Sequence, residues 1–297
     1  MTGISPVRLS NEFLSLEFLP DLGARVLNFT AASGRAVFRR TEPDEVPSGR
    51  CAAFLMLPYS NRIENARFTY EATRHQLQPG DDGHARHGDV RDRPWQVEAA
   101  SGTELTCTFN SRRFTDLNWP WAFTARVAYR LQGPVLSVSL TLTNADTTAM
   151  PAGMGLHPYL QRRDGPDDPE LTFDAKGLYL TDHRLIPARA AQAIPAERDF
   201  SAGRALADQV IDTVYADWDG EARLSWPDRA LVVRAEPVYS HLVVFTAPDG
   251  SLALEPVSHA TNAFNLAASG VTGTGMRSLR PGEHLRGSLT YTLTGKW

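Results

Sequence analysis

The sequence predicts an all-β fold, a large antiparallel β-sandwich with few short helices. Hydrophobic residues recur at every second position in many short segments, which is the pattern of strands with one buried face. The clearest case is 135–143, in which the even-numbered residues are Leu or Val and the odd-numbered residues after Val135 are Ser or Thr. The 22 Gly and 20 Pro residues often stand between such segments as turn signals, as at 78–80 and 281–282. Many short strands separated by turns are typical of a sandwich or a barrel.

The expected elements follow in chain order. Alternating patterns predict half-buried strands at 14–18, 123–129, 135–143 and 289–293. Continuous apolar runs at 231–233 and 242–245 predict strands that are buried more deeply. Helical periodicity is confined to 202–210 and 262–268, with room for two turns at most in each. No compositional break, linker or repeat divides the chain, so we expect a single domain over residues 1–297.

Composition narrows the class of protein. The 297 residues include 30 basic and 34 acidic side chains, with 42 % hydrophobic and 22 % charged residues, as is usual for a soluble globular protein. Without a basic excess, nucleic acid is not an expected partner. The chain has no apolar run long enough to span a membrane and no secretory signal pattern at its start, so we expect a cytoplasmic protein without a membrane partner. Cys51 and Cys107 fit either two free thiols or one disulfide.

Motifs for nucleotide binding and for several hydrolases are missing from the sequence, including G-x-G-x-x-G, the Walker A loop, G-x-S-x-G and H-E-x-x-H. Four short segments instead gather polar side chains in an apolar β context. The first, 57–65, places Asn61 beside Arg62, whose adjacent donors suit a polyhydroxylated or anionic ligand. The alternative for this segment is a surface loop in which Arg62 pairs with Glu64.

The second segment, 84–95, contains His84, His87 and Gly88 and ends at Trp95. Two histidines with a nearby Asp can ligate a metal, but their spacing matches no zinc helix or closed Cys/His site, and we predict no metal. His87 beside a glycine fits contact with a ligand, because glycine permits close backbone approach and Trp95 offers a flat apolar face. A solvated charged loop is the alternative.

The third and fourth segments each carry one conspicuous ionisable residue. His157 follows two glycines and precedes Pro158, which restricts it to extended backbone at a strand end. Glu255 stands at the end of an apolar strand pattern, where a carboxylate needs a partner or a polar site. A structural histidine and a buried salt bridge are the alternatives to an acid and a base with shifted pKa values. Asp212, which follows apolar residues, is a weaker candidate.

Taken in chain order, these segments resemble the aldose 1-epimerase (galactose mutarotase) superfamily, over nearly the whole chain from Leu14 to Leu293. The resemblance is carried by N-R-I at 61–63, H-G at 87–88 with R-P-W at 93–95, G-L-H-P-Y at 155–159, Asp212, and E-P at 255–256. The chain departs from the common pattern after H-P-Y, where it continues L-Q-R, and after E-P, where it continues V-S-H. With these departures the chain resembles the broader bacterial branch of the superfamily, so the resemblance does not identify the sugar.

The resemblance implies a galactose mutarotase-like supersandwich that interconverts the α and β anomers of an aldose. Its acid–base chemistry needs no metal or organic cofactor. It implies that Glu255 is the base that opens the ring and His157 the acid. Glu255 or Asp212 nearby would raise the pKa of His157 and keep it protonated. We expect these side chains to contact the sugar: Asn61, Arg62, His87, Asp212, and Trp95 or Phe264 as an apolar face.

Three alternatives stay open from the sequence. The first is a non-catalytic sugar-binding protein of the same fold. The second is a hexose-6-phosphate mutarotase, in which Arg62, Arg86, Arg91 or Arg93 would bind the phosphate. The third is a metal-dependent β-sandwich or cupin-like enzyme that uses His84 and His87. A small-molecule sugar is the expected partner, and the sequence does not separate a monomer from a homodimer.

Overall fold

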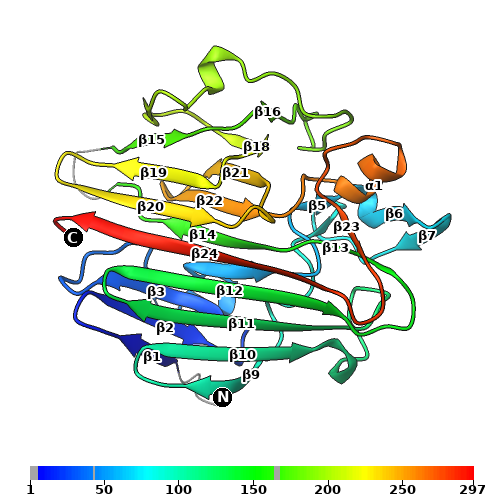
Figure 1. Cartoon of the computed structure of the whole chain (residues 1–297), viewed down its shortest axis with the longest axis horizontal. Coiled ribbons are helices and arrows are strands. Elements are labelled where there is room, and N and C mark those ends of the chain that lie inside the picture. The colour runs from blue at the N-terminus through cyan, green and yellow to red at the C-terminus, as the bar shows by residue number, and fades with distance from the viewer. Residues whose placement is uncertain (1–5, 43, 164–167) are drawn as a thin grey trace.

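The protein is a sandwich of two large antiparallel sheets (Figure 1). The computed structural model describes residues 6–42, 44–163 and 168–297. Sheet 1 has the order β1 (Val7–Ser10), β2 (Leu14–Leu19), β3 (Arg25–Ala31), β4 (Ala53–Met56), β14 (Gly155–Leu160), β22 (Leu252–Val257), β21 (His241–Thr246), β18 (Asp212–Ala216) and β16 (Gly177–Leu178). Sheet 2 has the order β17 (Arg204–Ala205), β15 (Glu170–Phe173), β19 (Glu221–Ser225), β20 (Arg229–Ala235), β24 (His284–Gly295), β12 (Val135–Asn144), β11 (Phe123–Gln132), β10 (Glu104–Asn110) and β9 (Gln96–Ala100). The predicted all-β sandwich is confirmed.

Smaller elements connect and cover the two sheets. Three two-stranded sheets pair β5 (Arg62–Ile63) with β8 (Ala85–Arg86), β6 (Arg67–Tyr70) with β7 (Thr73–Gln76), and β13 (Met150–Ala152) with β23 (Arg277–Leu279). The short helical turns are α1 (Ala263–Ala268) and the 3₁₀ turns Val46–Ser48, Glu64–Ala66, Ser111–Arg113 and Ala196–Arg198. The helix expected at 262–268 is therefore present. No helix in the described ranges is long and apolar enough to cross a membrane.

The helix expected at 202–210 is wrong. This stretch holds the short strand β17 and turns instead. Gly203 and Ala207 have φ values of +78° and +45°, which a right-handed helix does not allow. The apolar residues in this stretch do not form one buried helical face. Leu206 alone is buried in the core, and its neighbours on both sides are exposed.

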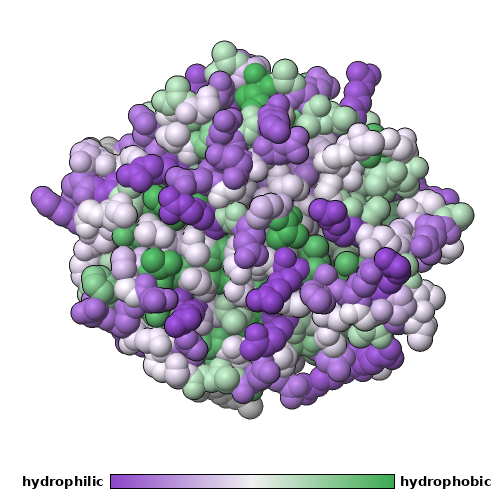
Figure 2. All heavy atoms as spheres, viewed as in Figure 1, coloured by the Kyte–Doolittle hydropathy of each residue, from purple (hydrophilic) through white to green (hydrophobic). Residues whose placement is uncertain are grey.

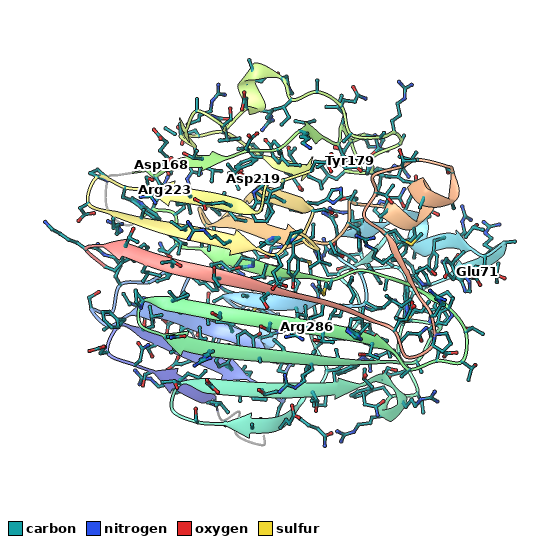
Figure 3. All side chains as sticks on the ribbon, in the orientation of Figure 1. Glu71, Asp168, Tyr179, Asp219, Arg223 and Arg286 are labelled. Carbon is teal, nitrogen blue, oxygen red and sulfur yellow. The ribbon has the colours of Figure 1, made fainter. Side chains whose placement is uncertain are left out.

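Sheet 2 has one buried and one outward face. In β12 the even-numbered residues are buried and their neighbours half-buried, as the alternating pattern predicts. Arg223 on β19 and Arg286 on β24 are exposed on the opposite side from the core (Figure 3). Hydrophilic side chains are spread over this side of the molecule, with smaller apolar areas between them (Figure 2). Sheet 2 therefore contributes mainly its inner face to the core.

The central strands of sheet 1 are buried on both faces, which explains their continuous apolar sequences. On β21 and β22, Leu242, Val244, Leu252 and Leu254 join the large cluster that fills the space between the sheets. The intervening positions, including Val243 and Val257, pack in a second cluster on the opposite face. Loops cover that second face, so a polar side chain placed there is removed from water. The deeply buried strand predicted at 242–245 is confirmed in β21, with only Phe245 partly exposed. The run 231–233, also predicted to be deeply buried, is buried too and lies on β20 of sheet 2.

Both cysteines are free thiols, and both are buried. Cys107 belongs to the core cluster between the sheets, whereas Cys51 lies in the cluster on the opposite face of sheet 1. The disulfide alternative is therefore not realised.

Gly88 is the point at which the 84–95 segment is fastened to sheet 1. Its backbone pairs with Leu57 in a parallel bridge, and the next amide, of Asp89, donates a hydrogen bond to the Leu57 carbonyl over 3.0 Å. A Cβ atom on Gly88 would lie 1.7 Å from that carbonyl oxygen. The close backbone approach expected at this glycine therefore exists, but it is to Leu57 and not to a ligand.

We predict that Gly88→Ala lowers the stability of the protein by about 2–5 kcal/mol, the sum of a left-handed backbone cost and an overpacking cost. Gly133→Ala is the matched control, because Gly133 also has a positive φ, +53°, but has open space around it. Thermal unfolding of both variants separates the two costs. Equal losses in the two variants would contradict the role assigned to the Leu57 contact.

Candidate functional site

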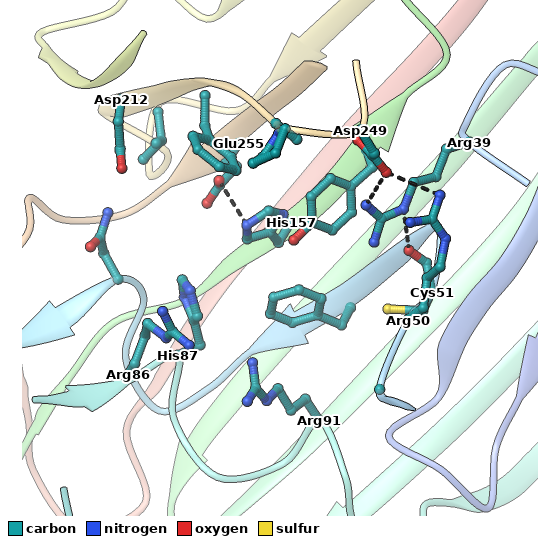
Figure 4. A pocket seen from close by; sticks show the side chains of 18 of the residues that line it. Arg39, Arg50, Cys51, Arg86, His87, Arg91, His157, Asp212, Asp249 and Glu255 are labelled. Atoms are coloured by element: carbon teal, nitrogen blue, oxygen red, sulfur yellow. Dashed lines mark hydrogen bonds and ion pairs between the residues drawn. The ribbon is translucent and has the colours of Figure 1, made fainter. Parts of the chain in front are cut away.

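His157 and Glu255 are brought together by the register of two neighbouring strands. Strands β14 and β22 are antiparallel, and Gly155 pairs with Val257 while Tyr159 pairs with Ala253. This register sets His157 opposite Glu255 on the same face of sheet 1, since side chains alternate along a strand. Their side chains meet, with His157 Nε2 3.0 Å from Glu255 Oε1 (Figure 4). Both residues lie within their strands, and not at strand ends as the sequence suggested.

The other neighbours of His157 are aromatic. Phe54 of β4 is its partner on the opposite flank, and the two rings stack with their centroids 4.6 Å apart. Tyr159, two residues along the same strand, lies 4.5 Å away by ring centroid. These contacts fix the plane of the imidazole, so that its Nε2 edge faces Glu255.

The pair borders a cavity of about 460 Å³ on the covered face of sheet 1. Four of the other expected site residues line the same cavity: Asn61, Arg62, His87 and Asp212. Asp212 is the first residue of β18 and reaches the cavity from the far side of Glu255 (Figure 4). Polar residues from segments that are far apart in the sequence thus meet at one cavity.

Trp95 and Phe264 do not line the cavity, and their assignment as an apolar face for the ligand is wrong. Trp95 is 2 % exposed, packs on Phe109, and donates its indole N–H to the Val90 carbonyl. Phe264 packs among aromatic side chains that include Tyr59. Large aromatic side chains gain most free energy by full burial, and these two are used in the core. Three other aromatic side chains line the cavity instead: Phe54, Tyr159 and Phe245.

The loop that carries Asn61 and Arg62 is held by main-chain contacts. Asn61 has a φ of +53°, and its carbonyl accepts a hydrogen bond from the His87 amide over 2.9 Å. Arg62 pairs with Arg86 in the short β5–β8 sheet. The Arg62 side chain contacts Asp82 at 3.2 Å, whereas Glu64 pairs with Arg184. The alternative in which Arg62 pairs with Glu64 is therefore wrong.

Two residues after β22 brace this loop, and the sequence analysis did not identify them. His259 Nε2 accepts a hydrogen bond from the Ser60 amide over 3.1 Å, and the Asn262 amide donates to the Arg62 carbonyl over 2.7 Å. His259 is fully buried, with its ring where a Cβ on Gly153 would have to lie. The glycine at 153 thus allows close packing against His259, which supports the site loop from behind.

The proposed metal alternative has no ligand cluster in the described part of the chain. His84 accepts a hydrogen bond at Nδ1 from the Asn65 amide, 3.0 Å away, while His87 faces the cavity. No group of three or more His, Cys, Asp or Glu side chains in the described ranges is arranged to hold a metal ion.

Burial controls the protonation of the His157–Glu255 pair. It lowers the pKa of His157 to about 3, and the positive charge of Arg39 acts in the same direction. Burial raises the pKa of Glu255 well above its ordinary value, with a further contribution from Asp212. The expectation that Glu255 or Asp212 would raise the pKa of His157 is therefore wrong, because the cost of burying an imidazolium exceeds their attraction.

The pair consequently holds one proton between its two groups near neutral pH. Glu255 Oε2 and His157 Nδ1 are buried, and neither has a hydrogen-bond partner among the described residues. His87 is also held uncharged, since burial and the neighbouring His157 lower its pKa. Burial raises the pKa of Asp212, opposed by the charge of Arg62. The site therefore contains buried polar atoms that have no hydrogen-bond partner among the described residues.

The chain belongs to the aldose 1-epimerase family, whose model matches residues 6–292. It is 28 % identical over 246 residues to the Escherichia coli K12 protein YphB, described as uncharacterized, covering 78 % of this chain and 80 % of YphB. Its structure is similar to that of a candidate aldose 1-epimerase from Escherichia coli K12, with a TM-score of 0.86, 23 % identity, and coverage of 99 % and 100 % of the two chains. A galactose mutarotase-like protein from Clostridium acetobutylicum gives a TM-score of 0.85 at 16 % identity, with 98 % and 95 % covered.

We predict that stability falls as the pH is lowered below 6.5, and that two buried histidines behind the site contribute to this fall together with His87 and His157. Burial lowers the pKa of both His241 and His259 to about 4, from an ordinary 6.5. Between those values only the unfolded chain binds these protons, so the stabilisation is complete above pH 6.5 and is lost toward pH 4, by about 1 kcal/mol per histidine per pH unit.

Melting temperatures measured from pH 7.5 to pH 4.5 check this, and His241→Phe should give a shallower slope than the wild type. A melting temperature independent of pH below 6.5 would contradict the assignment of two buried, uncharged histidines.

Proposed function

We propose that the protein is an aldose 1-epimerase that interconverts the α and β anomers of a sugar by opening and closing its ring. One observation carries the proposal: the buried His157–Glu255 contact of 3.0 Å, placed at the wall of a cavity of about 460 Å³. Cavities of this size hold small molecules. A site that only binds a sugar gains nothing from a buried carboxyl and imidazole that share one proton.

The reaction needs two proton transfers of opposite direction. Ring opening removes the proton from the anomeric hydroxyl at O1, breaks the bond between C1 and the ring oxygen O5, and adds a proton to O5. In the reactive form of the pair, the shared proton resides on His157 and Glu255 is ionised. Glu255 accepts the O1 proton while His157 donates to O5, and the open-chain aldehyde results. Each transfer by a positioned group contributes about 10²–10⁴-fold to such a rate.

The pair ends this step with one proton, now on Glu255. After rotation about C1–C2, closure reverses the transfers: Glu255 returns a proton to O1 and His157 receives the one on O5. No proton is gained or lost over the cycle. A pair that holds one proton in total thus suits a reaction that runs equally in both directions.

The other cavity residues would orient the sugar. Asn61 and Arg62 supply donors, Asp212 accepts from hydroxyls, and His87 presents its unpartnered Nδ1. Stacking on Phe54 keeps the His157 ring from turning away from Glu255 when a sugar enters. The remaining aromatic side chains at the cavity offer an apolar face for C–H groups.

We predict that Glu255→Gln and His157→Ala each lower kcat by at least about 10²-fold. Glu255→Gln should leave the melting temperature unchanged or higher. The raised pKa of Glu255 means that its contribution to stability is lost as the pH rises above 4.5, and a neutral amide avoids that cost. Polarimetry of freshly dissolved α-D-glucose and α-D-galactose measures the activity.

Glu71→Gln is the matched control, because Glu71 is exposed at the β6–β7 turn, away from the cavity (Figure 3). Wild-type activity in either site variant would remove that residue from the mechanism. Binding of a sugar without any acceleration by the wild type would favour a sugar-binding protein.

We also predict a broad plateau of kcat/KM against pH. An isolated carboxyl and imidazole of ordinary pKa, 4.5 and 6.5, would confine the one-proton state to the range between those values. Burial disfavours both the doubly protonated cation and the fully deprotonated anion, so it moves the two macroscopic pKa values apart. We therefore expect equal kcat/KM at pH 5.5 and 7.5. A tenfold fall per pH unit above 6.5 would contradict this account.

A further inference from the structure

Charge is distributed unevenly around the cavity. Its lining contains five arginines, Arg39, Arg50, Arg62, Arg86 and Arg91, against three acidic residues. Two of the acidic residues, Asp212 and Glu255, lie at one end, and burial raises the pKa of both. The third, Asp249, lies at the opposite end beside Arg39 and Arg50 (Figure 4). Arginines therefore outnumber acidic residues in the lining, and they lie at both ends of the cavity.

At the end of the cavity that holds Asp249, one carboxylate pairs with two guanidinium groups. Asp249 Oδ2 lies 2.9 Å from Arg39 Nη1 and 3.0 Å from Arg50 Nη2. Arg50 also contacts Glu45. Arg39, Arg50 and Asp249 line a second cavity of about 1050 Å³ as well, whose wall includes Arg40 and Lys296. The positive region thus extends from the reacting pair toward the outside.

Arg91 lines the cavity with little compensation for its positive charge. Its guanidinium carbon lies 5.4 Å from the centre of the Phe54 ring, on which His157 also stacks. Among the described residues, its one ion pair is made by Nε, 3.3 Å from Asp92, a side chain that is 59 % exposed. Both Nη groups of Arg91 remain for a ligand. Burial and the charges of Arg86 and Arg25 lower the pKa of Arg91, so its surroundings disfavour a cation.

A sugar that fills the cavity would displace water from Arg91. The Arg91 side chain is 35 % exposed in the free protein. With a neutral sugar in the cavity, its guanidinium would lose hydration and gain only neutral hydrogen bonds, which is costly for a charged group. With an anionic group on the sugar, the same guanidinium would form a charge-assisted contact, bidentate with a carboxylate or phosphate. An anionic group on the sugar would therefore offset the dehydration of Arg91 and raise the affinity for the substrate.

We propose that the substrate is an aldose bearing a negatively charged group, such as a carboxylate or a phosphate, and that Arg91 binds this group while His157 and Glu255 act at the anomeric centre. The inference rests on the proposed epimerase function. It identifies a specificity residue and a chemical class of substrate that the acid–base pair alone does not define.

The test compares matched sugars: glucose, glucuronate and glucose 6-phosphate, and also galactose and galacturonate. Exchange between anomers is measured by NMR magnetisation transfer for the wild type, Arg91→Gln, Arg91→Lys and the control Arg74→Gln. Arg74 is exposed on β7 and lies outside both cavities, so its variant removes the same charge elsewhere. Comparison of the carboxylates with the phosphate identifies the anionic group.

We expect kcat/KM to be at least tenfold higher for one of the anionic sugars than for its neutral counterpart. Arg91→Gln should reduce kcat/KM for that anionic sugar by about 10- to 100-fold, the range of a charge-assisted contact, mainly through KM. The loss for the neutral sugar should be smaller. Arg91→Lys should restore part of the preference, and Arg74→Gln should retain all of it. Added salt should raise KM for the anionic sugar alone.

Equal kcat/KM for neutral and anionic sugars, or a preference that survives in Arg91→Gln, would overturn the inference and leave the proposed epimerase function intact. Exchange of no sugar in the panel, with the wild type folded, would contradict the proposed function itself, and the inference with it.

Discussion

The structure depends on one constraint, the confinement of a carboxyl and an imidazole to opposite positions of two neighbouring buried strands. At 3.0 Å from each other and away from water, His157 and Glu255 cannot both follow their ordinary ionisation. Burial opposes a net positive and a net negative pair alike. In the state that remains, the two groups share one proton, and this proton can reside on either His157 or Glu255. The proposed acid–base chemistry rests on that state.

The rest of the fold keeps this pair in register and dry. A slip of one residue between β14 and β22 would turn one of the two side chains into the core, and the hydrophobic cluster between the sheets prevents that slip. On the other face, the loops that carry Asn61 and His87 cover the pair. They are fastened by backbone contacts, such as those at Gly88 and from His259, and the polar side chains are left to face the cavity.

Much of the site could be predicted because its residues interrupt apolar patterns. A glutamate inside an apolar strand and a histidine directly before a proline stand out in the local sequence. The resemblance to a family indicated that these two residues belong to one site. The pKa direction of His157 could not be predicted, because it depends on burial that no local pattern reveals. Trp95 and Phe264 were misassigned for the same reason, because the local sequence does not distinguish an aromatic side chain that faces the core from one that faces a ligand. Arg39 was missed because it lies outside the strands and reaches the cavity only through its contacts with Tyr159.

The shared proton of the free enzyme is the most direct test of this account. An infrared difference spectrum between the wild type and Glu255→Gln at pH 7 isolates the absorption of the Glu255 carboxyl group. Our account predicts a protonated carboxylic acid band in the wild type, because burial raises the pKa of Glu255 and lowers that of His157. A spectrum that shows only ionised carboxylate would mean that the pair is a permanent ion pair, and it would contradict the central claim.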